Sequence, residues 1–266
     1  MIMKHAFIAG AESGLAKAVI KELKDSYFLF CADIQYTEVE RRDNRINIPM
    51  DCYDEESIDK AVALVFKETE SLDLVSSFMG IVTLGSMVEL KPNTMEKIMK
   101  INFLSVYRLY NLLFPLLKNC GGRYITVTSE YAHLDALPIH GYYGVTKHAL
   151  TIYNDSLRRE LQKSGVTVTE ISPGAFKTSM QGGIEKQFDK LIEETHMYKS
   201  ILTKMRFLMT GEIKKAKDPS LFASTYMKAV NAKKPKRCYK VNNSFKMKFL
   251  SLLPASWQDL IFKFFL

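Results

Sequence analysis

Several features that mark other protein classes are scarce or missing in this chain. Its 266 residues include four cysteines, Cys31, Cys52, Cys120 and Cys238, and none of them stands in a C-x-x-C pair or at zinc-binding spacing. The cysteine content therefore excludes a disulfide scaffold, predicts no metal site, and suits free thiols in a reducing compartment.

No apolar run reaches the roughly 20 residues of a membrane-spanning helix. The first residues, MIMKHAFIAG, lack the pattern of a signal peptide. We expect a cytoplasmic protein.

Positive charge is abundant, but it is unevenly distributed along the sequence. The formal net charge is +8, yet the segment from Ala232 onward holds eight Lys or Arg against one acid, which leaves about +1 for residues 1–231. A nucleic-acid surface usually combines basic residues with exposed aromatics or a groove-reading helix, and neither pattern is present. We therefore expect no nucleic-acid partner. With 47% hydrophobic residues, the chain can bury one large core, so we expect a single domain over residues 1–266.

Short apolar runs alternate with segments of helical periodicity. The predicted strands are residues 4–10, 27–34, 45–50, 71–80, 122–129, 165–174 and 236–241. The predicted helices are residues 14–23, 55–69, 95–118, 142–161 and 219–230. This alternation predicts the α/β class, with a doubly wound, mostly parallel sheet of the Rossmann type.

Two segments fall outside this alternation. Residues 177–217 are rich in methionine and read as an insertion with its own helices, of the kind that closes over a ligand. Residues 242–266 form a tail in which four apolar side chains, Trp257, Leu260, Ile261 and Phe264, recur at helical spacing after a capping box of Ser256 and Asp259. We expect the apolar face of the tail to cover a substrate pocket or a neighbouring subunit. The alternative is weak contact with an anionic membrane surface through Lys246, Lys248 and Lys263.

A glycine turn joins the first strand to the first helix. The sequence AGAESGLAKA (9–18) places Gly10, Ser13, Gly14 and Leu15 at a helix N-terminus, where backbone N–H groups can approach a pyrophosphate. A tight turn also needs glycine for purely steric reasons. The turn alone does not decide between these two interpretations.

An acid ends the second predicted strand. Asp33 lies about twenty residues beyond the turn, where a carboxylate can accept hydrogen bonds from the ribose of an adenine nucleotide. A carboxylate there repels a 2′-phosphate, so the sequence favours NAD over NADP. Arg41 or Arg42 could reverse this preference by holding the phosphate.

The sequence YYGVTK (142–147) places Tyr143 four residues before Lys147 on a predicted helix. Residues at this spacing share one face, so the ammonium group can stabilise a phenolate. A phenol has a pKa of about 10, and a neighbouring cation lowers an acid's pKa by about 1–3 units. Tyr143 is therefore the candidate acid–base group, whereas Tyr142 has no lysine at this spacing.

Taken together, these residues and several later ones resemble the short-chain dehydrogenase/reductase family. The resemblance extends to about Val241 and is carried by Gly10, Gly14, Asp33, Asp51, Gly80, Asn102, Ser129, Tyr143, Lys147, Pro173, Gly174 and Thr178. It implies an oxidoreductase that transfers a hydride between a nicotinamide cofactor and a secondary alcohol or ketone. The expected cofactor is NAD, with NADP as the alternative.

The resemblance also implies roles for individual residues. Catalytic roles fall to Asn102, Ser129, Tyr143 and Lys147, with Asn102 in a kinked helical turn that serves a water relay to Lys147. Cofactor contacts fall to Gly10, Ser13, Gly14, Leu15, Asp33, Asp51, Cys52, Gly80, Tyr143, Lys147, Pro173, Gly174 and Thr178. Ser129 would hydrogen-bond the substrate oxygen as negative charge develops on it.

The chain departs from the family pattern in four places. Ala16 replaces a third glycine, SFMG (77–80) replaces an N-N-A-G sequence, and Thr128 replaces a serine. Ser129 also lies one residue farther from Tyr143 than is usual, which requires a one-residue insertion between them. Glu130 is the rival of Ser129 on spacing alone, but a carboxylate there would repel an alkoxide.

The substrate and the partners are inferred more coarsely. The Met-rich insertion and a tail similar to those of hydroxysteroid and retinol dehydrogenases suggest a bulky hydrophobic substrate such as a hydroxysteroid or bile acid. The alternatives are a reductase of fatty acyl or polyketide carbonyls and a non-catalytic dinucleotide sensor. We expect a homodimer or homotetramer. His133, His140 and His148 lack a partner acid at a recognisable spacing, so we expect them in a loop, at the pocket rim or on a helix surface.

Overall fold

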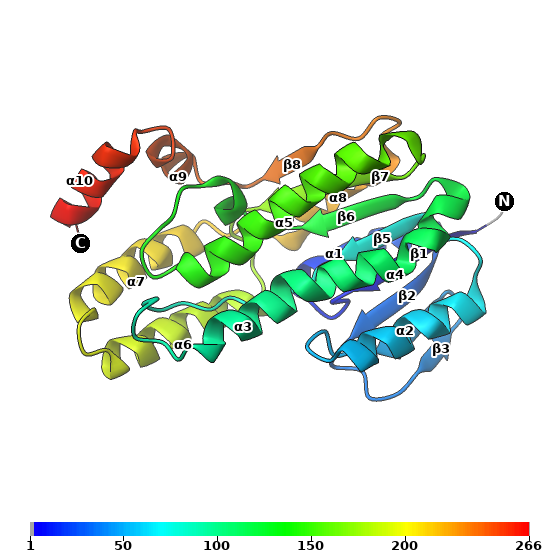
Figure 1. Ribbon diagram of the computed structural model, residues 1–266, viewed down its shortest axis with the longest axis horizontal. Coiled ribbons are helices and arrows are strands. Elements are labelled where there is room, and N and C mark those ends of the chain that lie inside the picture. Colours follow the sequence, from blue (N-terminus) through cyan, green and yellow to red (C-terminus); the bar gives the residue numbers. More distant parts are fainter. Residues whose placement is uncertain (1–2, 266) are drawn as a thin grey trace.

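The computed structural model describes residues 3–265 and shows one sheet with helices on both faces (Figure 1). The sheet has eight strands in the order β3-β4-β2-β1-β5-β6-β7-β8, and every neighbouring pair is parallel except β3 with β4. The predicted class, an α/β domain with a doubly wound and mostly parallel sheet, is confirmed.

The strands and helices have the following bounds. The strands are β1 (Lys4–Ala9), β2 (Tyr27–Asp33), β3 (Glu40–Arg42), β4 (Arg45–Pro49), β5 (Leu74–Ser77), β6 (Arg123–Val127), β7 (Thr167–Pro173) and β8 (Cys238–Val241). The helices are α1 (Gly14–Leu23), α2 (Glu55–Glu68), α3 (Asn93–Met99), α4 (Ser105–Cys120), α5 (Gly141–Glu160), α6 (Ser179–Glu194), α7 (Lys199–Ile213), α8 (Pro219–Asn231), α9 (Phe245–Leu250) and α10 (Ala255–Phe265). Short turns of other helical types are the π-helical η1 (Lys100–Leu104) and the 3-10 helices η2 (Glu130–His133) and η3 (Leu161–Lys163).

Two apolar clusters attach the helices to the sheet. One cluster joins α2, α4 and α5 to the face that carries Phe7, Phe30 and Val75. The other joins α1 and α8 to the opposite face, which carries Ile8 and Leu29. Because successive strand residues point to opposite faces, a sheet covered on both sides needs near-continuous apolar strands, and FIA in β1 and FLFCA in β2 meet this need.

The order of the strands determines where a ligand can bind. β1 pairs with β2 on one side and with β5 on the other, so the chain reverses its direction of winding at β1. In open α/β sheets, the crevice beyond the carboxyl ends of the strands at such a reversal is the usual ligand site. The glycine turn follows β1 and lies at this place.

The long helix predicted over residues 95–118 is interrupted. Residues Lys100–Leu104 form the π-helical turn η1 between α3 and α4, and Asn102 lies inside it. The irregular turn suggested at this asparagine is therefore present in the form of a π turn. A π turn widens the helical repeat, and such turns are frequent at functional sites.

Other expectations for individual elements were wrong. The edge strand β3 and the short helix α9 were not predicted, since each has too few residues to show a period. The strand predicted over residues 71–80 is shorter, Leu74–Ser77. Ser256 does not cap the tail helix, because α10 begins at Ala255 and the amides of Trp257 and Gln258 donate to the Pro254 carbonyl.

The insertion and the tail lie at the same end of the molecule. α6 and α7 fill residues 179–213, and α9 and α10 follow β8 on the same side (Figure 1). Within residues 3–265, no helix combines the length and the apolar character needed to cross a bilayer.

Candidate active site

The glycine turn is shaped by backbone contacts. Gly10 has φ of +76°, and a Cβ on it would lie 3.0–3.1 Å from backbone atoms of Phe78 and Met79. Ser13 caps α1 by accepting a hydrogen bond from the Ala16 amide. A Cβ on Gly14 would lie 2.8 Å from Cγ2 of Thr178. The turn therefore packs against the segment after β7, which brings two predicted cofactor-binding segments together.

Asp33 stabilises the turn as well as ending β2. It is buried, and its carboxylate accepts hydrogen bonds from the amides of Glu12 at 2.9 Å and Gln35 at 3.0 Å. The two arginines that could have favoured a 2′-phosphate are paired elsewhere: Arg41 with Glu68 at 2.5 Å and Arg42 with Glu40 at 2.9 Å. Among residues 3–265, no arginine forms a hydrogen bond or an ion pair with Asp33.

The segment after β4 lies next along the carboxyl edge of the sheet. Asp51 accepts a hydrogen bond from the Tyr53 amide at 2.8 Å, and the Asp51 amide donates to Ser57 Oγ at 2.9 Å. These bonds fix the loop before α2, where Cys52 is partly buried against the apolar cluster. Asp51 and Cys52 thus occupy an ordered loop beside Asp33, in the place expected for adenine contacts.

Tyr143 and Lys147 lie one turn apart on α5, and both are buried. The Lys147 ammonium lies 5.7 Å from the centre of the Tyr143 ring and donates to the Val127 carbonyl at 3.4 Å. Tyr142 is also buried and packs with Tyr143 and Ile98 in one apolar cluster. The structure thus places Lys147 next to one of the two tyrosine rings, as the i, i+4 spacing predicts.

The expected effect of Lys147 on the phenol does not appear. Burial raises the pKa of Tyr143 to about 12, and a hydrogen bond with Ser129 opposes that shift. Burial also lowers the pKa of Lys147 to about 8, while the charge of Glu170 opposes this. The prediction that the lysine lowers the pKa of Tyr143 is therefore wrong for this arrangement, because desolvation is the largest effect on both groups.

Asn102 joins three segments near Lys147. Its Oδ1 accepts from the Ile81 amide at 2.8 Å, and its Nδ2 donates to the Ile81 carbonyl at 2.9 Å and to Thr146 Oγ1 at 3.0 Å. A Cβ on Gly80 would lie 3.2 Å from Lys147 Nζ and 3.4 Å from Asn102 Oδ1. The glycine therefore lets the lysine and the asparagine approach the end of β5, where SFMG replaces the usual sequence.

Ser129 lies at the carboxyl end of β6 and begins η2. Its Oγ accepts a hydrogen bond from the Tyr131 amide at 3.3 Å, and its carbonyl accepts one from Ser172 Oγ at 3.0 Å. These bonds place the serine hydroxyl beside Tyr143, with which it shares a hydrogen bond. The extra residue between Ser129 and Tyr143 therefore does not separate the two hydroxyl groups.

The loop after β7 lies against both the glycine turn and the tail. Pro173 ends β7, and a Cβ on Gly174 would lie 2.0 Å from the Asn242 carbonyl oxygen. Thr178 precedes α6 and touches the glycine turn through the contact with Gly14. The predicted Pro-Gly-x-x-x-Thr element therefore has a second role that the sequence did not reveal, which is to receive the start of the tail.

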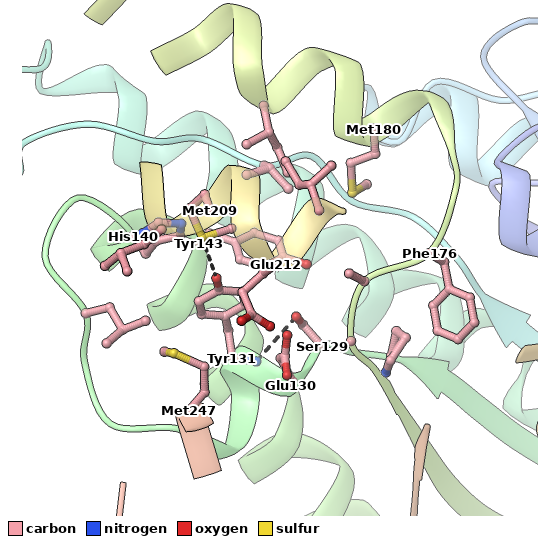
Figure 2. A pocket seen from close by; sticks show the side chains of 18 of the residues that line it. Ser129, Glu130, Tyr131, His140, Tyr143, Phe176, Met180, Met209, Glu212 and Met247 are labelled. Atoms are coloured by element: carbon pink, nitrogen blue, oxygen red, sulfur yellow. Dashed lines mark hydrogen bonds between the residues drawn. The ribbon is translucent and has the colours of Figure 1, made fainter. Parts of the chain in front are cut away.

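One cavity of about 1370 Å³ joins these segments. Its inner end is lined by residues of the glycine turn and of the catalytic group: Ser13, Gly14, Leu15, Ser129, Tyr143, Lys147 and Thr178. Its outer walls are formed by α6, α7, α9 and α10. Figure 2 shows Ser129, Tyr131 and Tyr143 facing the cavity, with Met209 and Met247 on its walls. Of the predicted site residues, the cavity is lined by Ser13, Gly14, Leu15, Gly80, Ser129, Tyr143, Lys147, Pro173, Gly174 and Thr178, whereas Gly10, Asp33, Asp51, Cys52 and Asn102 lie outside its lining. The insertion and the tail form the outer end.

Several lining residues were not expected from the sequence. Glu130, considered only as a rival of Ser129, accepts a hydrogen bond from the Ser244 amide at 2.7 Å and so holds the start of the tail. Burial raises its pKa. Tyr131 donates to Met209 Sδ, and Glu212 of α7 also lines the cavity. These contacts join segments more than 70 residues apart, and no local pattern reports such contacts.

His133 has no acid at a recognisable spacing in the sequence, but the fold pairs it with a distant one. Its Nε2 lies 2.6 Å from Glu170 Oε1, which also accepts from Thr128 Oγ1 at 2.6 Å, and Cys238 Sγ lies 3.6 Å from the same nitrogen. Thr128, where a serine was expected, therefore supports Glu170. This group, which no sequence spacing indicated, has the donor types of a metal site. Its hydrogen bonds nevertheless account for the positions of all its members.

His140 and His148 occupy different environments. His148 is exposed on α5 and pairs with the Gly144 carbonyl at 2.9 Å. His140 lines the cavity and stacks on Tyr131, with ring centres 5.1 Å apart. Its side chain is 3% exposed, and its Nε2 has no hydrogen-bond partner among the described residues. Burial lowers the pKa of His140 to about 4.

We predict that His140 makes the fold sensitive to mild acid. Between about pH 6.5 and pH 4, the His140 imidazole is protonated in the unfolded chain but stays neutral in the folded chain. The free energy of unfolding therefore falls as the pH falls. Denaturant unfolding at pH 7 and pH 5 should show a smaller loss for His140→Gln than for the unmutated chain, by about 1–2 kcal/mol. His148→Gln is the matched control. Equal losses in all three proteins would contradict the buried, neutral state of His140.

Comparisons with known proteins agree with this arrangement. A family model described as short chain dehydrogenase matches residues 4–189. The 3-oxoacyl-acyl-carrier-protein reductase FabG of Buchnera aphidicola is 26% identical over 203 residues, covering 73% of this chain and 82% of its own. Estradiol 17-beta-dehydrogenase 2 of Mus musculus is 28% identical over 257 residues, covering 89% of this chain and 67% of its own.

A solved structure has the same fold. The 3-ketoacyl-(acyl-carrier-protein) reductase of Brucella melitensis, complexed with NADH, superposes with a TM-score of 0.72 at 18% identity, covering 90% of this chain and 96% of its own. The family model covers well over half of the chain, including β1 to β7 and the glycine turn, Ser129, Tyr143 and Lys147. The chain therefore belongs to the short-chain dehydrogenase/reductase family of NAD(P)-dependent oxidoreductases.

Proposed function

We propose that this oxidoreductase interconverts a secondary alcohol and a ketone on a bulky hydrophobic substrate, of the size and character of a hydroxysteroid or bile acid. The observation that carries the proposal is the cavity that begins at Ser129 and Tyr143 and continues between apolar helices. Met205, Phe207, Leu208 and Met209 of α7 line it together with Met247 and Leu250 of α9. Such walls hold an apolar body, while the two hydroxyl groups orient one polar atom.

The cofactor site fits a dinucleotide. A Cβ at Gly10 or Gly14 would collide with Phe78 or Thr178, so the two glycines let the turn pack closely, and the N-terminus of α1 offers backbone N–H groups to a pyrophosphate. Asp33 would face the adenosine ribose, with Asp51 and Cys52 near the adenine. Pro173, Gly174 and Thr178 would hold the nicotinamide end. When bound, NAD(P) supplies or accepts the hydride.

The protein's own groups handle the proton and the oxygen. Tyr143 donates its proton to the substrate oxygen in reduction and takes it back in oxidation. Ser129 donates a hydrogen bond to that oxygen as negative charge grows on it. Lys147 holds a positive charge behind the phenol, and Asn102 fixes the backbone beside it. Because burial raises the pKa of Tyr143 to about 12, the phenol keeps its proton at neutral pH, which suits donation to a ketone.

The size of the substrate separates two candidate classes. The similarity to the estradiol dehydrogenase covers 89% of this chain, whereas the similarity to the acyl-carrier reductase covers 73%. The longer match and the volume enclosed by α7 and α9 favour a ring system. Reduction of fatty acyl or polyketide carbonyls is the second candidate, supported by the names of the relatives that carry out 3-oxoacyl reduction.

We predict that the Tyr143 hydroxyl is required for turnover. Tyr143→Phe should lower kcat at least about a hundredfold while cofactor binding persists, because the ring remains and only the proton-transfer group is lost. Turnover is measured by nicotinamide absorbance against a panel of hydroxysteroids, bile acids and short 3-oxoacyl thioesters.

Tyr142→Phe is the matched control for this substitution and should keep most of the activity. Equal activity of the two variants would refute the catalytic role of Tyr143. If the unmutated chain binds cofactor but turns over no member of the panel, the dinucleotide-sensor alternative is favoured instead.

We predict that Asp33 sets the preference between the two nicotinamide cofactors. NADH should be preferred to NADPH in kcat/KM, because the buried Asp33 carboxylate repels a 2′-phosphate and Arg41 and Arg42 are paired with acids. Asp33→Asn keeps an acceptor for the Glu12 amide and should reduce the preference at least about tenfold. Glu38→Gln, an exposed change in the following loop, is the control. A preference for NADPH in the unmutated enzyme would overturn the role given to Asp33.

We also predict the oligomeric state of the chain. α4 and α5 carry exposed apolar side chains, Tyr107 on α4 and Val145 and Ile152 on α5, on the helices that we expect to pair across a two-fold axis. We propose a homodimer or homotetramer built on these helices. Sedimentation at micromolar concentration should show the assembly, and Ile152→Glu should weaken it. A monomeric unmutated chain would contradict this expectation.

A further inference from the structure

We propose that the outer surface of α9 and α10 docks the protein on an anionic lipid bilayer. This surface, called the tail face below, consists of Phe245, Phe249, Leu252, Trp257, Leu260 and Phe264, all of which are exposed. Phe245 is 80% exposed, Leu252 72% and Trp257 62%. So many large apolar side chains in one short segment exceed the scattered exposure that soluble proteins tolerate.

The inner side of the same segment is fixed to the protein. Met247, Leu250 and Leu253 line the cavity, and the buried Gln258 donates to Asp135 at 2.5 Å and to the Leu253 carbonyl at 2.9 Å. The Ser244 amide is held by Glu130. The tail therefore has two sides: one packs over the cavity, and the other, the tail face, is turned outward. Phe249 lies where the two sides meet, since it is exposed and also lines the cavity.

The spacing of the exposed residues agrees with this division. Phe245 and Phe249 are four residues apart on α9, and Trp257, Leu260 and Phe264 follow the i, i+3, i+7 pattern on α10. A helix with one apolar side exposed and basic residues beside it is the arrangement that lies in the plane of a membrane interface. A tryptophan at that depth keeps its ring apolar and its N–H in contact with headgroups.

The charges identify the occupant of the tail face. Lys246, Lys248 and Lys263 lie within α9 and α10, and Asp259 is the one acid of these two helices. An anionic headgroup layer neutralises this charge while the acyl region accepts the apolar side chains. A second copy of the chain would bring the same lysines face to face, and like charges at an interface oppose association. The tail face therefore matches an anionic bilayer better than it matches itself.

This inference goes beyond the proposed reaction and does not depend on it. The cavity lies directly behind the tail, so a docked protein would have its cavity close to the phase in which apolar compounds accumulate. Binding to lipid is measured without substrate, so failure of the proposed reaction and failure of docking are distinguishable.

The experiment uses the single tryptophan of the chain as a probe. The full chain is mixed with vesicles of phosphatidylcholine alone or of phosphatidylcholine with phosphatidylglycerol. We expect co-sedimentation and a blue shift of the Trp257 emission with the anionic vesicles, both weakened as salt is raised. Brominated lipid should quench that emission.

Two pairs of variants test the surface. Phe245→Ser with Leu252→Ser removes two exposed side chains that do not line the cavity, and should weaken partitioning at least about tenfold. Phe66→Ser with Val88→Ser removes exposed apolar residues from α2 and from the loop before α3, outside the tail, and is the matched control that should leave partitioning unchanged. Unchanged binding of NADH shows that each variant is folded.

Three outcomes would overturn the proposal. They are no binding to anionic vesicles, equal loss in both pairs of variants, and a lipid-independent blue shift that rises with protein concentration alongside oligomer formation. The last outcome would assign the tail face to a second copy of the chain.

Discussion

The side-chain amide of Asn102 joins the three segments on which the site depends. By bonding both backbone groups of Ile81 and the hydroxyl of Thr146, it fixes the exit of β5, the start of α4 and the turn of α5 that carries Lys147. The π-helical turn around Asn102 gives the side chain this direction. Without these bonds, the backbone of Ile81 would lose two partners beside a buried ammonium, and an unpaired buried polar group costs about 1–3 kcal/mol. The position of Lys147 relative to Tyr143 depends on this junction.

Buried charge is balanced within the same region. The Lys147 ammonium lies in the interior, and the nearby carboxylate of Glu170 opposes the loss of its proton. Burial alone would raise the pKa of Glu170, but hydrogen bonds from His133 and Thr128 outweigh that effect, so its pKa is lowered. The carboxylate therefore stays ionised beneath the site. Thr128 and His133, which flank Ser129, keep this charge in place through their hydrogen bonds to Glu170.

The sequence was sufficient for the layered architecture because each strand and helix carries its own period. It also suggested the irregular turn at Asn102, because an amide fits poorly inside a long apolar helix. It could not indicate the bonds between Glu130 and Ser244 or between His133 and Glu170, which join residues 114 and 37 positions apart. The pKa of Tyr143 was predicted in the wrong direction, because the i, i+4 spacing reveals the neighbouring lysine but not how deeply the phenol is buried.

The contact between Gly174 and Asn242 has a consequence for protein engineering. A methyl group at Gly174 would lie 2.0 Å from the Asn242 carbonyl oxygen, so the loop after β7 and the chain leaving β8 are shaped to fit each other. Asn242 Nδ2 strengthens the match by donating to the Ala175 carbonyl at 2.6 Å. A chimera that takes the tail of another family member would therefore need that member's loop as well. The loop after β7 and the chain leaving β8 would have to be exchanged together, although 67 residues separate Ala175 from Asn242.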